Sequence, residues 1–180
     1  MGRTGRVYRR LRANFTAKPT FFTWVREASL AASGRPYSKD QVEWLKDNGV
    51  TAILTLTEEP LPSEWTRGIE THHVSLRDHA PLSPHQMRLG ADYIASSLAD
   101  GKVVLVHCLA GKGRTGCVLA AYFMAYEGKS ARQAIDELRS TRGGSVEGPQ
   151  VQNVLDFEAE AIRAWSTKAP GRETTTRTPP

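Results

Sequence analysis

Two residue types that could do chemistry together, Cys108 and Arg114, are separated by five residues in the stretch HCLAGKGRTG at 107–116. A cysteine thiolate is a nucleophile, and an arginine guanidinium can bind two oxygens of a phosphoryl group at once. Apolar runs flank the stretch, which predicts a short loop between a buried strand and a helix. With Gly111 and Gly113 giving the backbone freedom, the N–H groups of such a loop can surround a tetrahedral oxyanion at the helix N-terminus. The pattern indicates a site for a dianionic phosphoryl group.

We expect the residues of this loop to have distinct roles in a reaction with a phosphoryl group. The loop N–H groups, the helix dipole and Arg114 favour the thiolate form of Cys108, which we expect at the foot of the loop. In-line attack by this thiolate gives a covalent thiophosphoryl intermediate and needs neither a metal ion nor a cofactor. We expect the Thr115 hydroxyl to stabilise the sulfur and His107 to shape the loop by hydrogen bonding. The residues expected to bind the phosphate are Leu109, Ala110, Gly111, Lys112, Gly113 and Arg114.

The elements that must position this loop can be predicted from caps and hydrophobic periodicity. Three segments begin with a serine followed three residues later by a glutamine, a helix N-cap signature, at Ser38, Ser83 and Ser130. A further helix is predicted from about Pro149, and strand patterns occur at 51–57, 69–76 and 103–108. This alternation predicts an α/β fold, with a mostly parallel central sheet flanked by helices on both faces. Ligands of such sheets bind beyond the carboxyl ends of the strands, where the loop at 107–116 begins.

The charge of the chain is unevenly distributed along it. The net charge is +5, and 39% hydrophobic with 24% charged residues is typical of a soluble globular protein. Residues 1–13 hold five arginines and no acid, and residues 166–180 are rich in Thr, Pro and Gly with a net charge of +2, so residues 14–165 carry −2. We expect a basic flexible tail at 1–13, one domain at 14–165 and a disordered tail at 166–180. Contact of nucleic acid or a membrane with the basic tail is an alternative partner role.

Cysteine usage bears on the compartment. Cys108 and Cys117 are too few for a disulfide framework, and no Cys/His spacing is typical of a zinc site. No apolar stretch of 18 residues is present. We therefore expect a cytoplasmic protein without a bound metal. We also expect a monomer. Cys117 is either a core residue or, as the only other thiol, a redox partner of Cys108.

The loop and its context resemble a known family. HCLAGKGRTG is similar to the signature of the cysteine-dependent protein tyrosine phosphatase superfamily, particularly its dual-specificity branch. Residues 14–61 resemble the N-terminal half of small atypical dual-specificity phosphatases, and GGSVEGPQ at 143–150 resembles cell-division-cycle phosphatases. The likeness extends over about residues 14–160. It implies the protein tyrosine phosphatase-like fold and hydrolysis of phosphomonoesters through a cysteinyl-phosphate intermediate.

The resemblance also implies residues for the proton and water steps. The family takes its general acid from a loop about 30 residues before the nucleophile, which is the place of Asp78. Asp78 would protonate the leaving oxygen and later act as a base on water, the alternative being an exposed loop acid. Water positioning in the cell-division-cycle branch falls to a glutamine, and Gln150 ranks ahead of Gln152 for this role. His79, beside Asp78, either lines the pocket rim or is a solvated loop residue.

The substrate is less constrained than the reaction. Phosphotyrosine in a protein or peptide is the leading hypothesis, with phosphoserine and phosphothreonine as further substrates. Lys112 is expected to add a cation to the pocket wall, but tensin-related phosphoinositide phosphatases also have lysine where this chain has Leu109. The alternative is therefore a phosphoinositide, inositol-phosphate or RNA 5′-phosphate phosphatase that uses the same site. A non-enzymatic phosphate-binding module fits poorly, since the cysteine, arginine and aspartate are all present.

Overall fold

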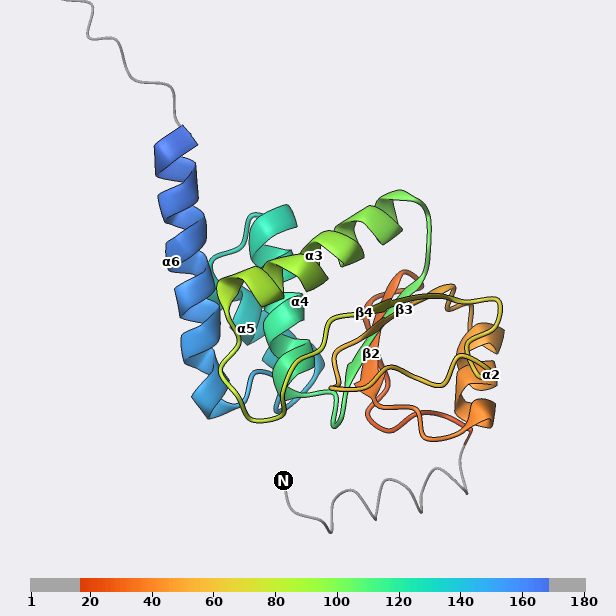
Figure 1. Ribbon diagram of the computed structural model, residues 1–180. Helices are drawn as coiled ribbons and strands as arrows, with labels where there is room; N and C mark the ends of the chain where they lie inside the picture. Colours follow the sequence, from red (N-terminus) through yellow and green to blue (C-terminus); the bar gives the residue numbers. More distant parts are fainter. Residues whose placement is uncertain (1–16, 169–180) are drawn as a thin grey trace, which may run out of the picture.

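The computed structural model describes residues 17–168 (Figure 1). The predicted tail at 1–13 and most of the one at 166–180 lie outside these residues, while the last helix continues three residues past the expected domain end at 165. In chain order the elements are β1 (Thr23–Arg26), β2 (Leu30–Gly34), α2 (Lys39–Asp47), β3 (Ala52–Thr55), β4 (Glu70–His73), α3 (Pro84–Ala99), β5 (Val104–Cys108), α4 (Gly113–Tyr126), α5 (Ala131–Thr141), the 3₁₀ turn η1 (Gly148–Gln150) and α6 (Val151–Lys168).

The strands form one sheet in the order β1-β2-β5-β3-β4. β2, β5, β3 and β4 run parallel to one another, and β1 pairs antiparallel with β2 at one edge. The central strand β5 is buried along its whole length, as expected for a parallel strand covered on both faces. The α/β fold with a mostly parallel sheet is therefore confirmed. The β1–β2 hairpin was not predicted from the sequence.

The two faces of the sheet are covered unequally. Figure 1 shows α2 alone on one face and α3, α4, α5 and α6 gathered on the other. Alternate residues of a strand point to opposite faces, so Leu105 of β5 joins the α2 core whereas Val104, Val106 and Cys108 join the core with α4. The side chain of Cys108 thus lies on the face covered by four helices.

The predicted helix caps are present. The Ser83 and Ser130 hydroxyls accept hydrogen bonds from the backbone N–H groups of the residues three positions on, Gln86 and Gln133. The side chains of these glutamines in turn accept from the backbone N–H groups of the serines, which completes two capping boxes. Ser38 caps α2 in the same way with its hydroxyl alone, because the Gln41 side chain accepts from Tyr37 instead. No helix within residues 17–168 combines the length and apolar composition needed to cross a bilayer.

The parallel pairing brings distant segments to one edge of the sheet. Gly34 pairs with Cys108 and Thr55 with His107, so β2, β3 and β5 end together. The segments that follow β3 and β4 continue from this edge, and they carry acidic residues. The carboxyl edge of the sheet is consequently where the predicted nucleophile meets carboxylates.

Candidate active site

The loop from Cys108 to Arg114, here called the nucleophile loop, is buried and closely packed. The Gly111 N–H group donates to the Cys108 sulfur at 3.3 Å. Gly111 has a φ of +76°, and a Cβ added there would lie 2.4 Å from the Ser33 carbonyl oxygen. Glycine is therefore required for both conformation and space. The loop leads directly into α4, so the positive end of this helix lies beside the sulfur.

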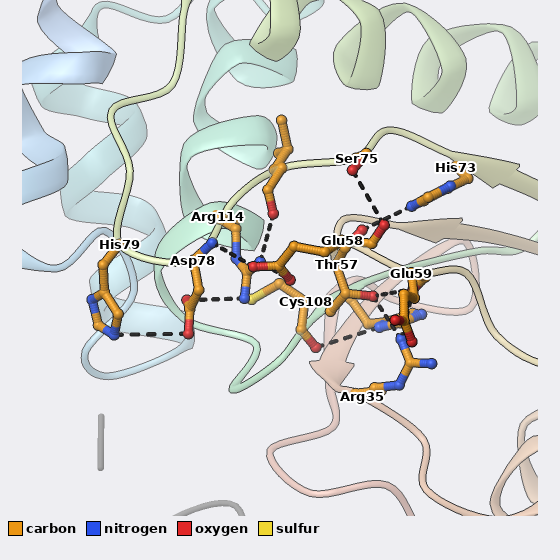
Figure 2. Close-up of polar contacts among 12 residues, drawn as sticks. Arg35, Thr57, Glu58, Glu59, His73, Ser75, Asp78, His79, Cys108 and Arg114 are labelled. Carbon is orange, nitrogen blue, oxygen red and sulfur yellow. Dashed lines mark hydrogen bonds and ion pairs between the residues drawn. The ribbon is translucent and has the colours of Figure 1, made fainter. Parts of the chain in front are cut away.

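Arg114 lies beside Cys108 and is almost completely buried (Figure 2). Its Nη1 donates to the Leu76 carbonyl oxygen at 2.7 Å and to Glu58 Oε2 at 3.1 Å. Its Nη2 lies 2.9 Å from Asp78 Oδ1. Three partners thus fix the guanidinium at the edge of the loop, in a position suited to bidentate binding of a phosphoryl group.

One pocket brings most of the predicted site together. Its lining consists of Asp78, His79, Cys108, Leu109, Ala110, Gly113, Arg114, Glu147 and Gln150. The predicted nucleophile, phosphate clamp and general acid therefore share one pocket, and His79 is a rim residue. The Nε2 of His79 lies 3.7 Å from Asp78 Oδ2.

Lys112 differs from its expected place, because it is not among the pocket-lining residues. Its ammonium group lies over the Phe21 ring, 5.3 Å from the ring centroid. Lys112 is the N-cap residue of α4, and the cation–π contact with Phe21 accounts for the direction of its side chain. Arg114 is consequently the cation that the pocket lining contains.

Asp78 belongs to the loop between β4 and α3, residues 74–83, here called the acid loop. Its backbone N–H donates to Glu58 Oε1 at 2.7 Å. Partial burial alone would raise the pKa of Glu58, but this bond and the contact with Arg114 outweigh it and lower the pKa. Glu58 remains a carboxylate that links the acid loop to Arg114 (Figure 2).

Arg142, at the end of α5, contacts the backbone of the nucleophile loop. The side chain is 1% exposed, and its guanidinium donates to the carbonyl oxygens of Gly111 at 2.8 Å and Ala32 at 2.7 Å. Burial lowers the pKa of Arg142 to about 10, an effect that the Cys108 sulfur partly offsets. Arg142 therefore stays charged at neutral pH, and its cation contributes to the positive field around the sulfur.

The sequence reasoning missed both Glu58 and Arg142. Glu58 follows β3, so the rule that ligands bind at carboxyl ends of parallel strands could have found it. Arg142 gave no such signal, because an arginine near a helix C-terminus is typical of an exposed charge that complements the helix dipole.

The two glutamine candidates lie in different surroundings. Gln150 lines the pocket, and its carboxamide lies so close to Gly113 that a Cβ added there would be 2.3 Å from Gln150 Nε2. Gln152 is exposed and donates to Asp156 on α6. The geometry therefore favours Gln150 for a role in the site.

The remaining predicted residues are buried around the loop. His107 Nε2 lies 2.9 Å from Thr55 Oγ1, and burial lowers the pKa of His107 to about 3. The Thr115 hydroxyl is buried without a hydrogen-bond partner among residues 17–168. Burial raises the pKa of Cys117 to about 12, and its thiol donates to the Gln150 carbonyl oxygen at 3.8 Å.

Within residues 17–168, no three His, Cys, Asp or Glu side chains are grouped to hold a metal ion.

Comparison with known proteins identifies the family. Residues 19–155 match the family described as PTP-SAK, Swiss Army Knife protein, DSP-PTPase phosphatase domain. The chain is similar to tyrosine-protein phosphatase CDC14 of Saccharomyces cerevisiae, with 42% identity over 130 residues, which is 71% of this chain and 23% of that protein. It is also similar to the phosphatidylglycerophosphate phosphatase PTPMT2 of Arabidopsis thaliana, with 32% identity over 128 residues, 67% of this chain and 55% of that one.

Among solved structures, the active form of Tk-PTP superposes with a TM-score of 0.69 at 30% identity, over 77% of this chain and 96% of that one. The chain spans about a quarter of the first curated relatives, 25% of cdcA of Emericella nidulans and 23% of CDC14. The family match covers most of the described domain, including the nucleophile loop and the acid loop. The chain therefore belongs to the PTP-SAK dual-specificity phosphatase domain family.

Proposed function

We propose that this chain is a protein-tyrosine phosphatase of dual specificity that works through a cysteinyl-phosphate intermediate. The observation that carries the proposal is the pocket in which Cys108, Arg114 and Asp78 meet. A nucleophile, a cation for the phosphate and a proton donor are the three groups that this hydrolysis needs. A free Cys108 thiol also suits a reducing compartment, which supports a cytoplasmic location.

In the first step, the phosphate takes the place of Asp78 on the Arg114 guanidinium and receives hydrogen bonds from the loop N–H groups. The Cys108 thiolate attacks the phosphorus in line with the leaving oxygen. The S–P bond forms as the P–O bond to the substrate breaks. Asp78, released from Arg114, takes up a proton from the solvent and donates it to the leaving oxygen, so the product departs as an alcohol or phenol.

In the second step, water attacks the phosphorus of the cysteinyl phosphate. Asp78 now accepts a proton from this water, a new P–O bond forms and the S–P bond breaks. Cys108 leaves as a thiolate, which the Gly111 N–H group and the α4 dipole stabilise. The position of Gln150 against Gly113 supports its assignment as the residue that orients the water.

Phosphate release from parallel substrates tests the proposal. Peptides with phosphotyrosine, phosphoserine and phosphothreonine, a phosphoinositide and an RNA 5′-phosphate would be compared, with Cys108→Ser as the matched variant. We expect release from phosphotyrosine peptides that persists in chelator and falls by about 10⁴-fold or more in Cys108→Ser, while vanadate binding is retained. Metal-dependent turnover, or a serine variant near the parent rate, would contradict the mechanism.

A lipid substrate is a second candidate, favoured by the similarity to PTPMT2, which is named a phosphatidylglycerophosphate phosphatase. The pocket lining supports the protein substrate more strongly, because Leu109 lines it and the Lys112 ammonium faces Phe21. A phosphoinositide carries further phosphates, which would find no lysine in this lining. The lipid arm of the panel distinguishes the two candidates.

A further inference from the structure

A second pocket lies next to the one that contains Cys108. Its lining consists of His79, Ala80, Pro81, Glu147, Pro149, Gln150 and Asn153. His79, Glu147 and Gln150 line both pockets, so the two are neighbours across these side chains. The second pocket is the larger, about 440 Å³ against about 280 Å³. A group that enters it would belong to the part of the substrate that flanks the phosphate.

The lining of the second pocket combines apolar walls with one carboxylate. Ala80, Pro81 and Pro149 supply the apolar surface, and no lysine or arginine is among its lining residues. Within residues 17–168, the Glu147 carboxylate makes no hydrogen bond or ion pair with another side chain; its electrostatic effect is on the buried Cys117 thiol, whose pKa it helps to raise. An uncompensated carboxylate beside apolar walls is complementary to a long side chain with an aliphatic stem and a cationic end.

The backbone before Glu147 is held in a strained conformation. Val146 is fully buried and has a φ of +53°, which is a costly region for a β-branched residue. Its carbonyl oxygen accepts from Arg139 Nη2 at 2.9 Å, and its N–H donates to the Lys112 carbonyl oxygen at 3.4 Å. Strain of about 1–3 kcal/mol persists where surrounding contacts enforce it, and such residues cluster at functional sites. Here the enforced conformation fixes Glu147 at the boundary of the two pockets.

We propose that the second pocket is a substrate subsite that binds a lysine or arginine side chain flanking the phosphorylated residue. This inference rests on the proposed phosphatase function and names the peptides that it prefers. The aliphatic stem lies against Pro81 and Pro149, and the cationic end pairs with Glu147. Because residues 79–81 belong to the acid loop and residues 147–150 to the segment before α6, an occupied subsite connects the two and holds Asp78 over the substrate.

A set of phosphotyrosine peptides tests the subsite. One flanking position at a time, from three before to three after phosphotyrosine, would carry arginine, alanine or glutamate. We expect arginine at one position to raise kcat/KM by about 3- to 10-fold over alanine, in the range of partly exposed ion pairs, with glutamate below alanine. The preference should shrink as salt is raised. Glu147→Gln should abolish the preference, and Glu147→Lys should reverse it toward glutamate.

The matched control is Glu160→Gln, an exposed carboxylate on α6 about 15 Å along the helix axis from Gln150. It should keep the arginine preference unchanged. Peptide binding to Cys108→Ser, followed by fluorescence anisotropy, gives a readout that needs no turnover and should show the same ratio of dissociation constants. Equal treatment of arginine and alanine peptides by an active enzyme, or an unchanged preference in Glu147→Gln, overturns the subsite. Absence of turnover on every peptide and on p-nitrophenyl phosphate overturns the proposed function instead.

Discussion

The nucleophile loop and the acid loop are held in opposite ways. Arg114 is 2% exposed, and the loop that contains it is fixed by backbone packing, by the α4 N-terminus and by the buried Arg142. Asp78 is 28% exposed and His79 58%, and the acid loop reaches the site through Glu58 and Arg114. In the proposed mechanism Arg114 is also the group that binds the substrate phosphate. The packing of the folded chain therefore determines the nucleophile loop. The acid loop is held by contacts with charged side chains, and the substrate phosphate competes for one of these contacts.

Replacement of Asp78, the proposed general acid, separates the two loops most strongly. Asp78→Asn leaves the nucleophile loop intact but cannot protonate the leaving oxygen. We expect the rate on phenyl phosphate to fall by about 10²- to 10³-fold, in the range of general acid catalysis. p-Nitrophenyl phosphate, whose leaving group needs little protonation, should lose far less. Steady-state kinetics on both substrates give the ratio, and equal losses on the two would exclude this role for Asp78.

Removal of Arg142 tests how firmly folding determines the nucleophile loop. Arg142→Met leaves the carbonyl oxygens of Gly111 and Ala32 without their buried donor. We expect a loss of about 2–4 kcal/mol in the free energy of unfolding and a fall in Tm of roughly 5–12 °C. Activity should fall on good and poor leaving groups alike, unlike in Asp78→Asn.

Arg132→Met is the matched control for this prediction, since Arg132 is exposed on the same helix, α5. Its unfolding free energy should stay within about 0.5 kcal/mol of the parent protein. Thermal unfolding of the three proteins decides the matter. An Arg142→Met protein as stable as the control would show that the loop does not depend on this guanidinium.

The fold was predictable to the extent that local signals determine it. The serine caps and the apolar run at 103–108 act through neighbouring residues alone. They are sufficient to predict β5 and three of the helices. β1 and β2 were not predicted, because their residues, TWVR and LAASG, show no clear alternation of polar and apolar side chains. β2 takes its position in the sheet from pairing with β5, a contact between segments more than 70 residues apart that no local pattern reports, and β1 then pairs with β2 at the edge.

The site divides in the same way. The elements of the nucleophile loop are adjacent in sequence, so Cys108 and Arg114 could be found by their spacing. Lys112 was expected in the pocket because it lies between them, but the Phe21 ring, distant in sequence, determines the direction of its side chain. Glu58 and Arg142 come from separate elements that meet only in the folded chain. Sequence therefore predicts the reacting groups better than the residues that hold them.

The buried imidazole under the nucleophile loop makes stability depend on pH. The pKa of His107 is about 3 in the folded protein, whereas an unfolded imidazole titrates near 6.5. Between these values the unfolded chain binds more protons, so stability falls as the pH drops below about 6.5. From pH 7 to pH 5 we expect His107 to account for a loss of about 1–2 kcal/mol. Denaturant unfolding at both pH values should show a smaller change in the free energy of unfolding for His107→Asn than for the parent protein. An equal change in the two proteins would show that another group binds the proton.

The contact between Glu58 and the acid loop gives the smallest expected effect and the most direct view of the difference between the loops. Glu58→Ala removes the acceptor of the Asp78 N–H group and one partner of Arg114, so Asp78 is less often in place. Glu58 is half exposed, and we expect only about a 3- to 5-fold loss on phenyl phosphate. Glu59→Ala, which removes an exposed neighbouring carboxylate and keeps the backbone carbonyl that accepts from Arg35, serves as the control. Because the defect concerns proton donation, p-nitrophenyl phosphate should be spared in Glu58→Ala as in Asp78→Asn. A uniform loss on both substrates would instead mean that Glu58 acts through Arg114, and that the two loops are less independent than their packing indicates.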